Sequence, residues 1–238
     1  MRRGPLPMTH SRPAPRWVLV WDLPSRVCHW GFAVSCSASL ALGLGFNPEN
    51  PVFKHHFLAG VMALWFLAVR IVLGFSGCRR ARWRSLFHLP HRTLQYFVDV
   101  ARWRAGDHDG LNPGTALFAL LVYLGVIGLI VTGFDPDWVE TWHGRLAYGV
   151  LGLIAFHLAG LALHAWRHRV WSPLAMIHGK WPAQVAVEPS GVRWRAGVGV
   201  LVLSGAVTWV VVRCFDLETS LLRIPGLPEI GFPLIQKG

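Results

Sequence analysis

Histidine is the residue type whose placement in this chain most clearly indicates chemistry. The chain has 12 histidines. Six of them lie in or at the ends of long apolar segments: His29, His55, His56, His143, His157 and His164. An imidazole can bind a metal or haem iron, or carry a proton. Ionisable side chains inside a bilayer are costly and usually mark a functional site, so the apolar segments that hold these histidines are placed next.

The composition is that of a membrane protein. Of the 238 residues, 53% are hydrophobic and only 15% are Asp, Glu, Lys or Arg, whereas soluble domains have about 25% charged residues. A membrane-spanning helix needs about 20 mainly apolar residues. Five segments meet this requirement: about 24–46, 55–75, 113–134, 143–166 and 196–212. None shows the alternation of a β-barrel strand, so we predict an all-α integral membrane protein.

Arginine distribution predicts the orientation. Basic residues precede the first segment and crowd the loops before the third and the fifth, whereas the other two loops have few or none. The positive-inside rule then places the N-terminus in the cytoplasm and the C-terminus outside. The net charge of +11 could suggest nucleic acid. We predict no nucleic-acid partner, because solvated cytoplasmic loops beside anionic membrane lipid explain these arginines better.

This topology sorts the histidines into two depths. His56 and His143 fall near the outer surface, whereas His29 falls about one turn into the first segment from the cytoplasm. His157 follows His143 by 14 residues, which places it about 21 Å deeper and within about 40° of the same helix face. His164 lies seven residues further along that face and is the alternative to His157. We favour His157, because His29 lies within its helix rather than at the surface.

Each depth therefore has two histidines on different helices. Such a pair suits one low-spin haem, with an imidazole on each face of the iron. Zinc or copper is the competing interpretation, but no carboxylate or thiolate accompanies either pair. A covalent C-x-x-C-H haem motif is absent, since Ser25 stands three residues before Cys28. Small residues that would give a macrocycle clearance, or simply pack helices, are Gly60, Gly144, Gly149, Gly152 and Gly160.

Several motifs together resemble one family. The segment V-W-D-L-P-S-R-V-C-H-W at 20–30 resembles the opening of the bacterial cytochrome b561 family, which includes the b-type cytochrome subunits of nickel–iron hydrogenases. His56-x-x-x-Gly60 with Arg70, the G-L-N-P-G sequence at 110–114, and His143, His157 and His164 at spacings of 14 and 7 resemble its next three helices. Residues 173–179 resemble its closing P-x-x-M-x-x-G segment.

The resemblance implies a four-helix transmembrane bundle with two haem b groups, which exchanges electrons with quinone in the bacterial cytoplasmic membrane. It implies the ligands His29, His56, His143 and His157, the same four that depth selects. We divide the chain into a cytoplasmic tail (1–16), a four-helix di-haem domain (17–182), a linker with a fifth transmembrane helix (183–213) and an extracytoplasmic tail (214–238). The roles of the fifth helix and the tail lie beyond the resemblance.

Arginines near these histidines are candidate partners for the anionic haem propionates. Arg26 and Arg70 lie on the cytoplasmic side, and Arg145 lies two residues from His143. Arg26 and Arg145 could equally face lipid headgroups, whereas Arg70 follows a mostly apolar run within the second segment. Arginine offers bidentate pairing with carboxylates.

Our main functional hypothesis is a di-haem cytochrome that moves electrons between quinone and an extracytoplasmic redox partner, such as a cytochrome c or a hydrogenase-like protein. An alternative is a quinone-linked oxidoreductase that acts alone on a small oxidant such as superoxide. A third is a haem-free transporter that uses the membrane histidines. A homodimer is a further partner hypothesis. The tail around 223–235 is apolar and broken by prolines, so we expect an exposed docking segment for the partner, or else a strap along the bundle rim.

Overall fold

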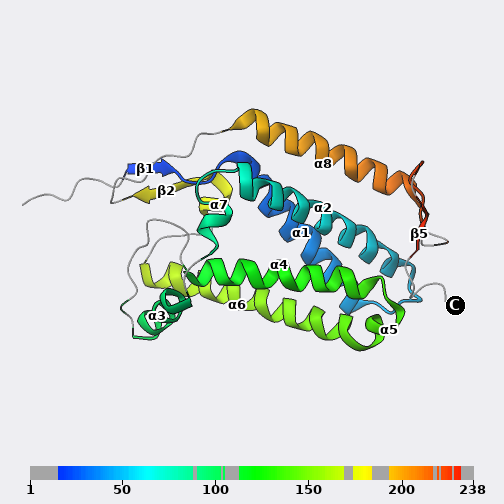
Figure 1. Ribbon diagram of the computed structural model, residues 1–238, viewed down its shortest axis with the longest axis horizontal. Helices are drawn as coiled ribbons and strands as arrows, with labels where there is room; N and C mark the ends of the chain where they lie inside the picture. Colours follow the sequence, from blue (N-terminus) through cyan, green and yellow to red (C-terminus); the bar gives the residue numbers. More distant parts are fainter. Residues whose placement is uncertain are drawn as a thin grey trace, which may run out of the picture.

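Five long apolar helices dominate the computed structural model, which describes residues 16–87, 90–102, 104, 113–168, 174–183, 193–216, 219, 221–226 and 228–231. They are α1 (Leu23–Gly45), α2 (Lys54–Ser76), α4 (Pro113–Gly133), α6 (Gly144–His168) and α8 (Trp194–Cys214). Each is long and apolar enough to cross a membrane. They run side by side in alternating directions (Figure 1). The predicted all-α membrane fold is confirmed, and the predicted segments agree with the helices to within about two residues.

Local sequence signals explain where these helices begin. Asp22 caps α1 by accepting a hydrogen bond from the Ser25 backbone N–H at 3.2 Å, and Pro24 occupies the first turn, where its missing N–H costs nothing. A 3₁₀ turn, η1 (Pro51–Phe53), leads into α2. The short α5 (Pro136–Trp138) and a π-helical turn, η3 (Val139–His143), lead into α6. His143 therefore ends a π-turn, a feature that is frequent at functional sites.

Four of the helices form the bundle that the sequence predicts. α1 pairs with α2, α4 pairs with α6, and contacts between α2 and α4 and between α1 and α6 close the structure. All four supply residues to one buried core cluster: Cys36, Leu40, Ala63, Leu67, Val122, Val126, Ala147 and Val150. A Cβ added to Gly125 of α4 would lie 2.7 Å from the Val150 side chain on α6, so this glycine lets the two helices approach closely.

The fifth helix packs on the outside of the α1–α2 pair. Figure 1 shows α8 along that edge, with α4 and α6 on the opposite side. Polar contacts hold it within the apolar surroundings: Trp65 of α2 donates to the Ser204 hydroxyl at 2.9 Å. At its start, Arg193 donates to the Ser76 carbonyl at 2.6 Å and pairs with the fully buried Asp22 at 3.4 Å. These contacts place α8 away from the space between the four helices.

A strand pair and two helical segments near the His29 end of the bundle were not predicted. Strand β1 (Arg16–Leu19) pairs antiparallel with β2 (Lys180–Ala183), and the pairing joins Trp17 to Pro182 at the two boundaries of the predicted di-haem domain. The Arg-rich loop, expected to be only solvated, contains η2 (Trp83–Ser85) and the amphipathic α3 (Pro90–Ala101). The closing segment includes the short α7 (Ala175–His178). Parts of three predicted features lie outside the described residues: 110–112 of the G-L-N-P-G motif, Pro173 of the closing motif, and 1–15 of the N-terminal tail.

The C-terminal tail begins with apolar residues that pack on the bundle. It forms a small antiparallel sheet of β3 (Phe215–Asp216), β4 (Leu221–Leu222) and β5 (Ile230–Gly231). Phe215 and Leu222 are directly paired and buried. Both belong to a second core cluster with Phe53, Phe57 and Val211 at the His56 end of α2. Within the predicted docking segment at 223–235, Ile224 and Ile230 pack against this cluster, whereas Pro225 and Glu229 are exposed. The docking role of that segment stays a prediction.

Candidate functional site

A cavity of about 440 Å³ lies inside the bundle at the His56 end. Its walls come from α1, η1, α2, α4, η3 and the start of α6, and they are mostly apolar. The polar groups that line it include Ser39, His56 and His143. An apolar cavity with a few convergent polar groups is typical of a cofactor-binding site.

Two predicted ligands, His56 of α2 and His143 of η3, face one another in this cavity. Their ring centroids are 6.0 Å apart and the ring planes are inclined by 84°. The neighbouring His55 is exposed and contacts the Val52 carbonyl instead. The structure therefore brings together the two histidines that depth assigned to this level and leaves His55 outside.

Hydrogen bonds orient both imidazoles in the same way. Nδ1 of His56 lies 2.7 Å from the Ser39 carbonyl oxygen and 3.1 Å from its hydroxyl. Since a carbonyl can only accept, Nδ1 carries the proton and Nε2 has a free lone pair. Nδ1 of His143 lies 3.2 Å from the Thr132 hydroxyl, which itself donates to the Gly128 carbonyl at 2.8 Å. Both rings thus keep Nε2 available for a metal, as metal-binding histidines generally do.

Two glycines that the sequence analysis missed adjoin these rings. A Cβ on Gly43 would lie 2.7 Å from Cε1 of His56, and a Cβ on Gly133 would lie 3.3 Å from Cε1 of His143. Of the glycines proposed from sequence, Gly60 and Gly144 line the cavity. The other three, Gly149, Gly152 and Gly160, are exposed and have no neighbouring atoms within 4 Å of an added Cβ. Those three do not give clearance at this cavity, because helix rotation turns them outward.

The second histidine pair lies nearer the other end of the bundle. His29 of α1 and His157 of α6 are both half-buried and close enough to interact electrostatically. The His157 ring stacks on Phe118 of α4, with centroids 4.3 Å apart and planes 10° apart. His164 instead lies against Trp181 of β2, with ring centroids 6.2 Å apart.

Arg70 projects from α2 toward α4 and holds an unused donor. Its Nε donates to the Tyr123 hydroxyl at 3.0 Å, and its guanidinium lies 5.5 Å from the Trp83 ring centroid and 5.6 Å from that of Tyr123. Its Nη1 is buried and has no hydrogen-bond partner among the described residues. Buried polar groups are almost always paired, so this donor indicates a place for an acceptor group. The sequence singled out Arg70 but not Trp83 or Tyr123.

The other two candidate arginines have different surroundings. Arg26 donates through Nη1 to the Ile177 carbonyl of α7 at 2.6 Å, and its Nε is buried without a partner among the described residues. Arg145 is exposed, lies over the Trp142 ring at 5.3 Å and does not line the cavity. The structure therefore places Arg145 at the surface rather than against the histidine pair.

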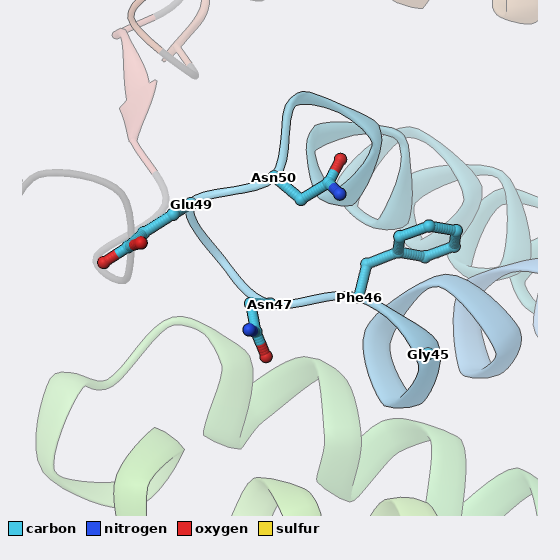
Figure 2. Close-up of a pocket in the computed structure, with 5 residues that line it drawn as sticks. All are labelled: Gly45, Phe46, Asn47, Glu49 and Asn50. Atoms are coloured by element: carbon cyan, nitrogen blue, oxygen red, sulfur yellow. The ribbon is translucent and has the colours of Figure 1, made fainter.

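A second hollow of about 430 Å³ adjoins the cavity at the end of α1. It is lined by Gly45, Phe46, Asn47, Glu49 and Asn50, and Figure 2 shows these side chains around the loop that joins α1 to η1, with Asn47 pointing toward the green helices. Phe46 and Asn47 line both hollows. The two hollows therefore meet at this loop.

The histidine pair can be compared with the ligands that zinc and haem iron need. Within the part of the chain that the structure describes, no group of three or more His, Cys, Asp or Glu side chains could hold a metal ion. Zinc sites take three or four protein ligands. A haem iron takes four ligands from its macrocycle and needs only two from the protein. The paired imidazoles therefore meet the protein's share of the ligands of a haem iron.

The five apolar helices define a multi-pass, mainly helical membrane protein, and the sequence comparisons place it among the b-type cytochromes. The family model of prokaryotic cytochrome b561 matches residues 20–179, and the chain belongs to this family. Its membership makes haem b the expected cofactor and membrane electron transfer the general role. A probable Ni/Fe-hydrogenase B-type cytochrome subunit of Bradyrhizobium diazoefficiens is 28% identical over 180 residues, which cover 63% of this chain and 70% of the relative. No solved structure matches significantly.

Proposed function

We propose that this chain is a di-haem cytochrome that moves electrons across the membrane between quinone and an extracytoplasmic redox partner. The observation that carries the proposal is the His56–His143 pair, two half-buried side chains that line an apolar cavity with both Nε2 atoms available. The family makes membrane electron transfer the general role. The haem number, the ligands, quinone and the partner are our inferences from these side chains.

The residues present fit a haem. His56 and His143 would hold the iron of this haem, each through the Nε2 that its Nδ1 hydrogen bond leaves free. The His56 and His143 centroids are 6.0 Å apart. Gly43 and Gly133 leave the space beside these rings free of side chains. Donor type and clearance therefore both suit one haem b at this level.

The second haem would be held by His29 and His157. Stacking on Phe118 orients the His157 ring, and Arg70 supplies a buried cationic donor on the same side of the bundle for a propionate. Arg26 supplies a second such donor near α7. Charge-assisted hydrogen bonds to carboxylates are stronger than neutral ones. His164 is less suited to the role because it lies against β2.

Each bound haem would supply a reversible one-electron change between ferric and ferrous iron. The protein's part is to hold the imidazoles, orient them through Ser39 and Thr132, and exclude water with the apolar core of the four helices. The positive-inside pattern puts the His56–His143 pair on the outer side. The similarity to a probable hydrogenase cytochrome subunit supports a redox enzyme as the extracytoplasmic partner.

Haem content tests this proposal directly. A pyridine haemochrome assay on the purified full chain should give about two haems per chain, all extractable with acid acetone because no covalent motif is present. A fully loaded protein with one haem or none would contradict the di-haem assignment.

A further inference from the structure

The C-terminal tail packs behind the imidazole of His56. Phe53 stacks on the His56 ring with centroids 5.3 Å apart and planes inclined by 26°, and Phe57 meets it edge-on at 5.5 Å. Both phenylalanines line the cavity. Val211, Phe215 and Leu222 complete the buried cluster that contains these two rings. A single layer of aromatic rings therefore separates the tail from the candidate ligand.

Contacts at both ends of α8 hold the tail in this position. Arg193 and Gly197 fix the start of α8 against α1: Arg193 pairs with Asp22, and a Cβ on Gly197 would overlap the Leu23 side chain. At the other end, Phe215 pairs with Leu222 across β3 and β4. Arg223 also forms ion pairs with Asp216 at 3.6 Å and with Glu229 at 3.2 Å. The exposed ion pairs contribute little energy, so the buried apolar residues hold the sheet on the bundle.

We propose that α8 and the tail sheet act as a positioning element for the outer haem ligand, with Leu222 and Phe215 holding Phe53 against His56. This inference rests on the proposed function, because it assumes that His56 binds haem iron. The packing has two consequences for that site. It restricts rotation of the imidazole about its bond to the helix, and it keeps water from the side of the cavity that Phe53 and Phe57 close.

Both consequences affect the midpoint redox potential, which can be measured for each haem separately. The apolar shell around a metal controls solvent access, and thereby the redox potential. Water admitted beside the iron stabilises the more highly charged ferric state, so the midpoint potential falls. The second haem, held by His29 and His157 further along the bundle, serves as an internal reference in the same molecule.

The matched variants are Leu222→Ala and Leu221→Ala in the full-length protein. Leu222 is buried in the cluster, whereas Leu221 is its half-buried neighbour on the same strand and lies outside the cluster. The readouts are a spectroelectrochemical titration of both haems and the electron paramagnetic resonance signals of the ferric protein. The potential and signal that His143→Ala removes identify the outer haem.

We expect Leu222→Ala to lower the midpoint potential of the outer haem and change its resonance signal, with the inner haem unchanged. Leu222→Ile should keep the potential and the resonance signal close to those of the original protein, and Leu221→Ala should change neither. Unchanged haems in Leu222→Ala, or an equal shift of both haems, would overturn the positioning role. If Leu222→Ala does not accumulate, Phe215→Leu gives the same comparison with most of the apolar volume kept. Unaltered haem content in His56→Ala would instead refute the proposed function itself.

Discussion

The Arg70 guanidinium on α2 donates its Nε hydrogen bond to the Tyr123 hydroxyl on α4 at 3.0 Å, while its Nη1 stays buried without a partner among the described residues. The contact joins two helices of the bundle and leaves a charged donor buried and unused. A hydrogen bond to a charged group contributes about 1.5–3 kcal/mol. We attribute the spare donor to a propionate of the haem at the His29–His157 level.

Replacing Arg70 should therefore weaken the haem held by His29 and His157. We expect Arg70→Gln to reduce the affinity of that haem roughly 10- to 100-fold, as the loss of one charge-assisted hydrogen bond predicts. Tyr123→Phe keeps the aromatic ring beside the guanidinium and should have a smaller effect. Haem retention during repeated detergent washing, followed by the reduced spectrum, measures both. Selective loss of the other haem would argue against this placement of Arg70.

The histidine pairing makes a sharper prediction. His56→Ala and His143→Ala should each remove the same haem, and His29→Ala and His157→Ala should each remove the other, because an iron with one protein ligand loses its low-spin spectrum. His55→Ala and His164→Ala are the matched controls and should retain both haems. Difference spectra of the reduced variants, with expression checked, give the answer. If His29→Ala and His56→Ala lost the same signal, the pairing would be wrong.

Gly43 offers a test of the space beside His56. Gly43→Ala would place a Cβ 2.7 Å from Cε1 of the His56 ring, so we expect the ring to shift and the outer haem to be lost or loosened. Gly45→Ala is the control on the same helix, because its Cβ would meet nothing within 4 Å. Alanine is a better helix former than glycine by up to about 1 kcal/mol. An effect on helix stability alone would therefore not reduce the haem content of either variant. Equal haem content in the two variants would refute the steric argument.

Thr132 should tune the iron through His143. Thr132→Val keeps the shape of this buried side chain but removes the hydroxyl that lies 3.2 Å from Nδ1 of His143. Loss of such a bond makes the imidazole a weaker electron donor to the iron. At comparable metal sites, such a loss lowers the affinity for the metal about 10–100-fold. We expect a higher midpoint potential for the outer haem, with Thr132→Ser close to the original protein. A redox titration checks this, and a shift confined to the inner haem would contradict it.

The sequence alone determined the fold class and the five spans, because a bilayer demands runs of about 20 apolar residues. A bilayer also makes each polar residue within such a run conspicuous, and this singled out the four histidines that we propose as ligands. The order and direction of the spans then assign His56 and His143 to one depth without tertiary information, and the structure places these two rings 6.0 Å apart. The cap at Asp22 and the prolines near the helix starts are local signals of the same kind.

Only the tertiary structure decided which other side chains surround the histidines. Ser39, Gly43 and Thr132 resemble ordinary helix residues in the sequence, and their roles come from the rotation of α1 and α4 toward the cavity. Gly149 and Gly152 show the reverse, since they lie close to His143 in sequence yet face outward. The tail is the clearest case: Phe215 and Leu222 are buried only because α8 delivers them to Phe53 and Phe57. Apolar contacts between distant segments have no sequence period, and therefore only the assembled helices reveal them.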